Sequence, residues 1–395
     1  MRQVYADNAA TTAVSPTVVE AMLPYFGEYY GNPSSLHSFG QKAAAAMDES
    51  RKTIAACLGC KPGEIYVTSG GTEADNWAIE SAIRQGAKKG KKHLITTKFE
   101  HHAILHAMEE KEKQGFDVTY LDVYQDGLVR LDDLAGAIRP ETALVSIMYA
   151  NNEIGVIEPV AEIGKLCRER GVLFHTDAVQ AAGHLVIDVE EQCIDFLSLS
   201  AHKFHGPKGV GILYCRRTVP LYNMIYGGAQ ERGKRPGTEN PAAVVGMATA
   251  LREACDAMAT DMPRVAAMRD RLIAGLAAIP KSHLNGHPTR RLPGNVNFAF
   301  EGIEGESLLL SLDMKGIAAS SGSACTSGSL DPSHVLLAIG LPHEVAHGSL
   351  RLSLSHLNTE EDVDHILTEL PPIVEYLRSI SPVWERIAQE EAAAV

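Results

Sequence analysis

Short apolar runs alternate with amphipathic stretches all the way from Glu64 to Cys215. This alternation is typical of strands followed by helices, and a chain of this kind folds into a largely parallel sheet covered by helices. The expected strands are EIYVT, KHLITT, DVTYLD, TALVSIMYA, VLFHTD, DFLSLS and VGILYC, with helices such as 72–89 and 159–170 between them. The sequence therefore predicts an α/β domain.

The remainder of the chain has a different pattern. A length of 395 residues, 45% of them hydrophobic, suits one large core and a smaller satellite domain. A helical segment begins at Pro241 and runs to a break at PKSHLNGHPTRRLPG. Beyond it, NVNFAFE and GSLRLSLS are strand candidates, and a last helix is expected from Thr359 to about Arg378. This part is predicted to be a small α+β domain.

The charge balance and the cysteines narrow the class of protein. The formal net charge is -13, so nucleic acid or an anionic membrane would repel the chain. The start, MRQVYADNAATT, has no basic stretch followed by an apolar run, and no later segment has the apolar length of a membrane span. The 7 cysteines are odd in number and irregularly spaced, which fits free thiols in a reducing compartment. We expect a soluble cytoplasmic protein without nucleic-acid or membrane partners.

Two ionisable residues are expected at strand ends. In SAHKFHGPKG, Lys203 follows an apolar strand, and a half-buried lysine with a lowered pKa can hold an aldehyde cofactor as an imine. The alternative is that Lys203 and Lys208 lie on an ordinary loop. In HTDAVQ, Asp177 has His175 and Gln180 beside it, and a carboxylate there could keep a pyridine nitrogen protonated. A helix cap or a turn is the alternative for Asp177.

The segment TSGGTEADN follows one predicted strand and opens a helix. The backbone amides of Gly71 and Thr72 would point outward there, and the start of a helix attracts phosphate. The segment lacks the lysine of a nucleotide-binding P-loop and the spacing of a dinucleotide fingerprint. A turn followed by a capped helix therefore stays open as the alternative.

Cys325 differs from the other cysteines. It lies in SSGSACTSGS, among small side chains that could not bury it in a core, and reactive groups gather on such loops. Gly322 and Gly328 would leave the backbone free to move. The other cysteines lie mostly in apolar or helical surroundings, where a buried thiol is the ordinary interpretation.

Metal binding is not expected. Cys57 and Cys60 form a CxxC pair, but no second pair stands at a ligand spacing, so ordinary structural thiols are favoured. The spacing of His101, His102 and His106 does not place a clean pair on one helix face.

Taken together, these segments resemble a known family nearly from end to end. The chain is similar to the cysteine desulfurases of the class V aminotransferase fold, and among them to the nitrogen-fixation (NifS) group. The resemblance is carried by YADNAATT, GNPSSLHSFG, TSGGTEADN, FEHHAIL, YANNEIG, HTDAVQ, SLSAHKFHGPKG, ERGKRPGTEN, SSGSACTSGSLDPSHV and AHGSLRLSLS. It implies pyridoxal 5'-phosphate as cofactor and the type I fold of enzymes that use it, with a mainly parallel seven-stranded sheet.

The same resemblance implies the domain limits. The large cofactor-binding α/β domain would span 14–258. The small α+β domain would comprise 1–13 and 259–395, and would carry the catalytic cysteine loop at about 320–330.

Roles for the site residues follow from the resemblance as well. Lys203 would bond the cofactor aldehyde, Asp177 would pair with the pyridine nitrogen, and Gln180 would hydrogen-bond the ring hydroxyl. His101 would stack on the ring and shuttle protons. The phosphate would be held by Gly71, Thr72, Ser200 and His202, with Thr238 reaching in from a second subunit.

A site shared in this way implies a homodimer. Arg351 would bind the substrate carboxylate, assisted by Asn32 and Asn152, because a guanidinium offers two parallel donors.

The implied reaction takes sulfur from L-cysteine, leaves L-alanine, and places a persulfide on Cys325. An iron–sulfur scaffold protein would receive that sulfur, and the Ser/Gly-rich loop and the ending SPVWERIAQEEAAAV favour nitrogenase maturation. Cys325 could also ligate an iron–sulfur cluster transiently. The alternatives are a housekeeping desulfurase, a selenocysteine lyase or aminotransferase on the same fold, and a sulfur-transfer scaffold without turnover.

Overall fold

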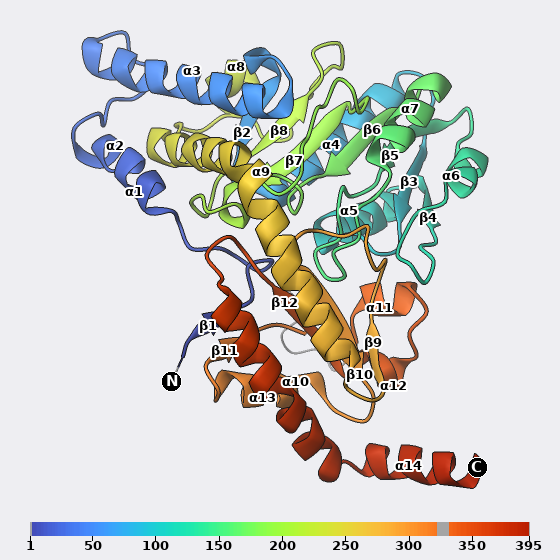
Figure 1. The fold of residues 1–395 in the computed structure, drawn as a ribbon. Coiled ribbons are helices and arrows are strands. Elements are labelled where there is room, and N and C mark those ends of the chain that lie inside the picture. The colour runs from blue at the N-terminus through green and yellow to red at the C-terminus, as the bar shows by residue number, and fades with distance from the viewer. Residues whose placement is uncertain (1, 322–331, 395) are drawn as a thin grey trace.

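The structure is a computed structural model that describes residues 2–321 and 332–394. Two lobes are visible in Figure 1, an upper one built around a large sheet and a lower one that contains both ends of the described chain. The long helix α9 (Pro241–Ala277) runs from one lobe into the other.

The upper sheet has seven strands in the order β2-β8-β7-β6-β5-β3-β4. Their bounds are β2 Ile65–Thr68, β3 His93–Thr97, β4 Asp117–Leu121, β5 Thr142–Ser146, β6 Leu173–Asp177, β7 Phe196–Ser200 and β8 Gly211–Cys215. Only β8 runs antiparallel to its neighbours β2 and β7, and all the other neighbouring pairs are parallel. The prediction of seven strands in a mainly parallel sheet is confirmed.

Helices cover both faces of this sheet because successive strand residues point to opposite sides. Leu94 and Leu144 belong to one core cluster, whereas their neighbours Ile95 and Val145 belong to another. Helices α4 and α5 close the first cluster, and α3, α7 and the first half of α9 close the second. The helices of this lobe outside α9 are α1 Pro16–Met22, α2 Pro24–Gly27, α3 Ser38–Leu58, α4 Gly71–Ala87, α5 His102–Lys113, α6 Leu131–Ala137, α7 Val160–Arg170 and α8 Gln230–Gly233, with 3-10 turns η1 Pro62–Glu64 and η2 Ala201–Lys203.

The helix predicted to begin at Pro241 is confirmed as α9, which is 37 residues long. The side chain of Asn240 caps it by accepting a hydrogen bond from the Ala243 amide at 3.1 Å, and Pro241 occupies a first-turn position that suits proline. Val244 packs in the upper core and Leu272 in the lower one, so a single helix contributes to both.

The lower lobe contains the two strands predicted for it. These are β10 Asn295–Phe300 and β12 Ser349–Ser353, which pair antiparallel, with β9 Ser282–Leu284 on the other side of β10. The last predicted helix is present as α13 Glu360–Ser379, capped by Thr359. The remaining elements, which were not predicted individually, are β1 Val4–Tyr5, α10 Gly305–Asp313, β11 Ile317–Ala318, α11 His334–Ala338, α12 His343–Ala346 and α14 Pro382–Ala394.

The beginning of the chain belongs to the lower lobe. Strand β1 pairs in parallel with β11, and Val4 and Ala6 are buried in the same core cluster as Leu272. This pairing directs the residues after Ala6 towards the space between the lobes. The exact domain boundaries given above stay a prediction.

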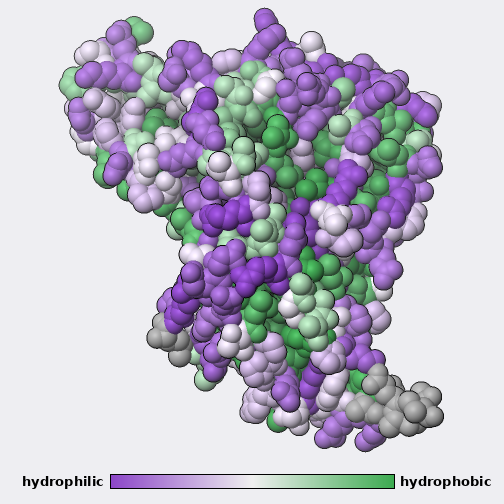
Figure 2. All heavy atoms as spheres, viewed as in Figure 1, coloured by the Kyte–Doolittle hydropathy of each residue, from purple (hydrophilic) through white to green (hydrophobic). Residues whose placement is uncertain are grey.

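No helix of the described ranges is long and apolar enough to cross a membrane. On the face drawn in Figure 2, hydrophilic side chains extend over both lobes, with smaller hydrophobic areas between them.

Candidate active site

A cavity of about 400 Å³ lies where the two lobes meet. Its upper part is formed at the carboxyl ends of β6 and β7 and at the start of α4, and Arg351 enters from β12 of the lower lobe. Ligands commonly bind at this edge of an α/β sheet. The residues that line the cavity are Ala9, Ala10, Gly71, Thr72, Asp75, His101, Met148, Ala150, Asn152, Asp177, Val179, Gln180, Ser200, His202, Lys203 and Arg351.

Lys203 stands at the end of the short turn η2 that follows β7. Its Nζ donates to the backbone carbonyls of Ala9 at 2.6 Å and Ala10 at 2.8 Å. The N-terminal segment is fixed against this turn, since the Thr12 amide donates to the carbonyl of His202 at 2.9 Å. The predicted amine is therefore in the cavity, held by the N-terminal segment.

Asp177 ends β6 and is 6% exposed. Its Oδ1 accepts a hydrogen bond from the Val179 amide at 2.9 Å. Burial raises the pKa of Asp177 to about 6, and the Val179 hydrogen bond and the charge of Lys203 limit the rise. Asp177 can thus carry a negative charge near pH 7 opposite a cation. Gln180, three residues on, donates from Nε2 to the Ala9 carbonyl at 3.0 Å.

The first turn of α4 faces the cavity. Gly70, the residue before this helix, has a φ of +152°, a conformation that side-chain-bearing residues rarely adopt. A Cβ on Gly71 would lie 2.7 Å from Cγ2 of Val179, so a larger residue at this position would force the Val179 side chain to shift. Ser200 also lines this end, and the N-terminus of a 17-residue helix favours an anion.

His101 and His202 are neutral imidazoles in this cavity. Burial, helped by the nearby Lys203 charge, lowers the pKa of each to about 4. His101 caps α5 through Nδ1, which accepts from the Ala103 amide at 3.1 Å. Because Nδ1 is an acceptor, the proton of neutral His101 resides on Nε2. Nδ1 of His202 lies 3.1 Å from Oγ1 of Thr11.

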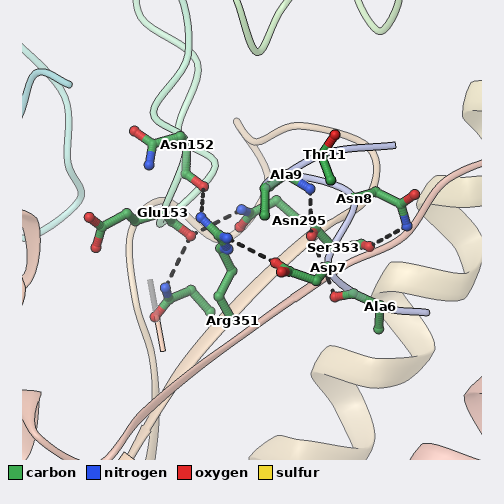
Figure 3. Close-up of polar contacts among 12 residues, drawn as sticks. Ala6, Asp7, Asn8, Ala9, Thr11, Asn152, Glu153, Asn295, Arg351 and Ser353 are labelled. Carbon is green, nitrogen blue, oxygen red and sulfur yellow. Dashed lines mark hydrogen bonds and ion pairs between the residues drawn. The ribbon is translucent and has the colours of Figure 1, made fainter. Parts of the chain in front are cut away.

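Arg351 is 2% exposed and forms the lower-lobe wall of the cavity. One terminal nitrogen donates to the Asn152 carbonyl and the other to Oδ1 of Asp7, both at 3.0 Å (Figure 3). Its Nε is buried without a hydrogen-bond partner among the described residues. A buried guanidinium with a donor to spare is suited to a carboxylate ligand.

Two of the predicted residues are not brought to the cavity in this chain. Asn32 is exposed, and its Oδ1 accepts from the Ser34 amide at 2.9 Å. Thr238 is exposed as well, and neither residue lines the cavity. Cys325 lies outside the described residues.

The residues that flank the segment of Cys325 are attached beside the cavity. Ser320 and Arg351 exchange backbone hydrogen bonds, with the Arg351 amide donating at 2.6 Å. On the other side, Ser333 Oγ donates to the buried carboxylate of Glu153. Nε2 of His334 lies 2.9 Å from the carbonyl of Glu100, the residue before His101.

Sequence reasoning missed three acidic residues around the cavity. Asp7 pairs with Arg351, Asp75 lines the cavity at 1% exposure, and Glu100 is fully buried beside it. Asp7 and Asp75 lie in the segments YADNAATT and TSGGTEADN, which carried the family resemblance without a role for either carboxylate.

The side chains present fit pyridoxal phosphate. The helix start at Gly71 suits the phosphate, the buried carboxylate of Asp177 suits a protonated pyridine nitrogen, and the Lys203 amine suits the aldehyde. All three line one cavity, together with a guanidinium that still has a donor available.

Comparison with known proteins agrees with this geometry. Residues 4–366 match the family described as aminotransferase class-V. The chain is 56% identical over 387 residues to the cysteine desulfurase IscS of Clostridium botulinum strain Hall, covering 97% of each chain. It is 55% identical to the IscS of Methanosarcina thermophila, covering 97% of this chain and 94% of that one. A solved NifS-like protein superimposes with a TM-score of 0.90 at 38% identity, covering 95% of this chain and 100% of that chain. The chain therefore belongs to the aminotransferase class-V family and, within it, to the pyridoxal-phosphate-dependent cysteine desulfurases.

Proposed function

We propose that this chain removes sulfur from free L-cysteine, releases L-alanine, and holds the sulfur as a persulfide on Cys325. The observation that carries the proposal is the shared cavity, in which Lys203 and Asp177 lie opposite Arg351 and the flanks of the Cys325 segment are attached. An amino acid bound by its carboxylate at Arg351 would have its amine towards Lys203 and its side chain free to meet a thiol.

When bound, pyridoxal phosphate supplies an electron sink for the carbon that loses its proton. Lys203 would form the bond to the cofactor and, once released by the substrate amine, take the α-proton of the substrate. Asp177 would keep the pyridine nitrogen protonated, and Gln180 would contact the ring hydroxyl. Gly71, Thr72, Ser200 and His202 would hold the phosphate.

His101 is suited to donating a hydrogen bond rather than to accepting a proton. Its Nδ1 is engaged by the Ala103 amide and its pKa is lowered to about 4, so the imidazole offers an Nε2–H at neutral pH. We propose that His101 stacks on the cofactor ring and donates a hydrogen bond from Nε2–H to the bound substrate.

The sulfur transfer needs a thiolate. An ordinary cysteine thiol with a pKa near ~8.5 is only a few per cent ionised at neutral pH. In the proposed step the Cys325 thiolate bonds to the sulfur of the substrate while the carbon–sulfur bond breaks. The electron pair stays with the substrate carbon, which becomes the methyl group of alanine after protonation, and the sulfur remains on Cys325.

The proposed biological context concerns the oligomeric state and the acceptor of the sulfur. We propose a cytoplasmic homodimer in which Thr238 and the exposed Asn32 of one copy approach the cavity of the other, and an iron–sulfur scaffold protein as the acceptor of sulfur. The similarity to relatives named IscS supports a general role in iron–sulfur cluster assembly. A nitrogenase-specific role is the second candidate.

The test uses Cys325→Ala, with Cys193→Ala as a matched control on a half-buried thiol away from the cavity. The Cys325 variant should keep the visible absorbance of bound cofactor, yet release negligible alanine and gain no sulfur atom in its intact mass after incubation with L-cysteine. The control should behave as the wild type. Alanine release by Cys325→Ala at the wild-type rate would refute the proposed nucleophile. A wild type that acts on selenocysteine but not on cysteine would favour a selenocysteine lyase.

A further inference from the structure

Two carboxyl side chains lie at the upper surface of the same cavity. Asp177 comes from the end of β6, and Asp75 comes from the second turn of α4, where it is 1% exposed. Both side chains are buried, at 6% and 1% exposure respectively, and a cofactor with one pyridine nitrogen needs only one of the two charges.

The two carboxyls have unequal partners. Asp177 accepts a backbone hydrogen bond from Val179 and is stabilised as an anion by Lys203. For Asp75, Oδ1 is buried without a hydrogen-bond partner among the described residues, and Ser198 alone favours its charged form. The surroundings therefore stabilise negative charge on Asp177 far better than on Asp75.

The imidazole nearest to Asp75 does not supply a positive charge. Nε2 of His175 lies 3.6 Å from Oδ1 of Asp75, but burial lowers the pKa of His175 to about 3. Both ring nitrogens already have partners, since Nδ1 lies 2.8 Å from Oγ of Ser146 and Nε2 lies 3.0 Å from Oγ of Ser198. His175 is consequently neutral.

A third buried carboxyl, that of Glu100, carries little charge near pH 7. Glu100 is fully buried, and its Oε1 accepts from Oγ1 of Thr97 at 2.7 Å and from the Met148 amide at 3.0 Å. The pKa of Glu100 is raised to about 8, mainly by burial and in part by the charge on Asp177. The positive charge of Arg351 offsets little of the negative charge on these carboxyls, because Arg351 already pairs with Asp7. One net negative charge is therefore the most that this side of the cavity accommodates easily.

We propose that Asp75 remains a neutral acid and acts as a positioning residue, which leaves the single buried negative charge on Asp177 for the cofactor nitrogen. This inference rests on the proposed role of Asp177. If Asp75 were ionised instead, repulsion would favour a proton on Asp177, and a protonated Asp177 could not hold a pyridinium. Burial raises the pKa of Asp75 well above its usual value, and the charge of Asp177 acts in the same direction.

The first test measures protonation without using activity. Infrared spectra of the two cofactor-free proteins at pH 7 are compared. The wild type should show the C=O stretch of a protonated buried carboxyl, and Asp75→Asn should lack this band. Glu100→Gln serves as the matched control, because it removes a different buried carboxyl and should leave the Asp75 band in place. Absence of any band that depends on Asp75 would overturn the proposal.

The second test measures competition for the charge. In Asp177→Asn the repulsion from Asp177 is gone, so the Asp75 band should disappear at a lower pH than in the wild type. An unchanged titration would mean that the two residues do not compete, which refutes the proposal. This comparison also decides the question if Asp75→Asn does not fold.

The third test uses the pH dependence of stability. A raised carboxyl pKa means that the folded protein binds more protons than the unfolded chain, so keeping Asp75 costs stability as pH rises above its unfolded value. The melting temperature of cofactor-free Asp75→Asn should therefore exceed that of the wild type, by more at pH 8 than at pH 5. A stability difference between variant and wild type that is the same at pH 5 and pH 8 would mean that Asp75 is ionised in the folded protein, which contradicts the proposal.

These outcomes are separable from those of the proposed function. If the wild type bound no pyridoxal phosphate, the proposed function would fail and the positioning role would fail with it, whereas the infrared and melting data would still report the charge on Asp75. If the cofactor binds and the Asp75 band is absent, only the inference about Asp75 falls.

Discussion

The two sides of the cavity are held in different ways. On the upper side, Asp177 and His101 are each fixed by a backbone amide two residues further along the chain. On the lower side, Arg351 is fixed by Asp7 and by Asn152, which are 344 and 199 residues away in sequence. Asp177 and His101 on the proposed cofactor side are thus fixed by local contacts within one lobe, although Lys203 beside them donates to the Ala9 and Ala10 carbonyls of the N-terminal segment. The guanidinium of the proposed substrate side is fixed only by contacts between distant segments.

This difference implies that cofactor binding and substrate binding can be damaged separately. A change on the upper side should remove both cofactor and activity, because substrate chemistry depends on the cofactor. A change on the lower side should leave the cofactor bound and lower kcat/KM for cysteine. The following substitutions test that separation, beginning with the largest expected effect.

Lys203→Ala should abolish both covalent cofactor binding and activity. The variant lacks the amine that bonds the cofactor and takes the substrate proton, and loss of a positioned acid–base group alone costs about 10²- to 10⁴-fold in rate. We expect loss of the visible absorbance of covalently bound cofactor and of measurable alanine release. Lys208→Ala, an exposed lysine on the same loop, is the matched control and should retain both. Full absorbance in Lys203→Ala would rule out the assigned lysine.

Arg351→Lys should separate the two sides. Lysine keeps the charge but lacks the forked donors that hold Asp7, the Asn152 carbonyl and a substrate carboxylate together. Loss of one charged hydrogen bond, worth about 1.5–3 kcal/mol, should reduce kcat/KM for cysteine about 10- to 100-fold. The cofactor absorbance should be unchanged, and steady-state kinetics with spectra of the same preparation check both. A parallel loss of cofactor would show that the two sides are not independent.

Glu158→Gln tests the region that joins the two sides. Glu158 is buried in the loop that follows Asn152, where Oε2 accepts from the Val129 amide at 3.0 Å while Oε1 lacks a partner among the described residues. Burial raises the pKa of Glu158 to about 8. A carboxyl whose pKa is higher in the folded protein than in the unfolded chain reduces stability as the pH rises from the unfolded-state pKa towards the folded-state pKa. The wild type should therefore lose stability between about pH 5 and pH 8 because of Glu158.

The glutamine variant should lack that loss and be more stable than the wild type at pH 8, by up to about 4 kcal/mol. Denaturant unfolding at pH 5 and pH 8 measures the difference. Glu162→Gln on the exposed surface of α7 is the control, and it should show no such pH-dependent gain. Equal stabilities of Glu158→Gln and wild type at both pH values would mean that Glu158 is ionised in the folded protein.

The same contrast explains how much could be predicted from the sequence. The strands were predictable because β3, β5, β7 and β8 are buried at every position and are therefore rich in apolar and small residues, with few charged ones. Asp177 and Lys203 could be placed at one sheet edge, since the carboxyl ends of parallel strands meet there. These features depend on local patterns.

Features that depend on distant contacts were not predictable in this way. Strands β1 and β11 have two residues each and pair with one another although they lie far apart in the sequence. Neither is long enough to show a hydrophobic pattern that predicts a strand. Nothing near Asp7 or Arg351 in the sequence indicates that they pair. Asp75 looks like an ordinary polar residue of a helix, and only the packing of α4 against β6 and β7 reveals that its carboxyl is buried beside Asp177.

Gly71→Ala should have the smallest effect and should be confined to the upper side. The new methyl would lie 2.7 Å from Cγ2 of Val179, so Val179 must shift, and the amide of Val179 is the group that holds Asp177. We expect the dissociation constant of pyridoxal phosphate to rise about fivefold, equivalent to about 1 kcal/mol. Reconstitution titrations of the cofactor-free protein measure it. Gly136→Ala in α6, where a Cβ would meet nothing within 4 Å, should bind as the wild type does. The double variant Gly71→Ala, Val179→Ala should recover most of the lost affinity, because it removes the atom that the methyl strikes; if it does not, the weakening arises from the helix start itself and not from the link between Val179 and Asp177.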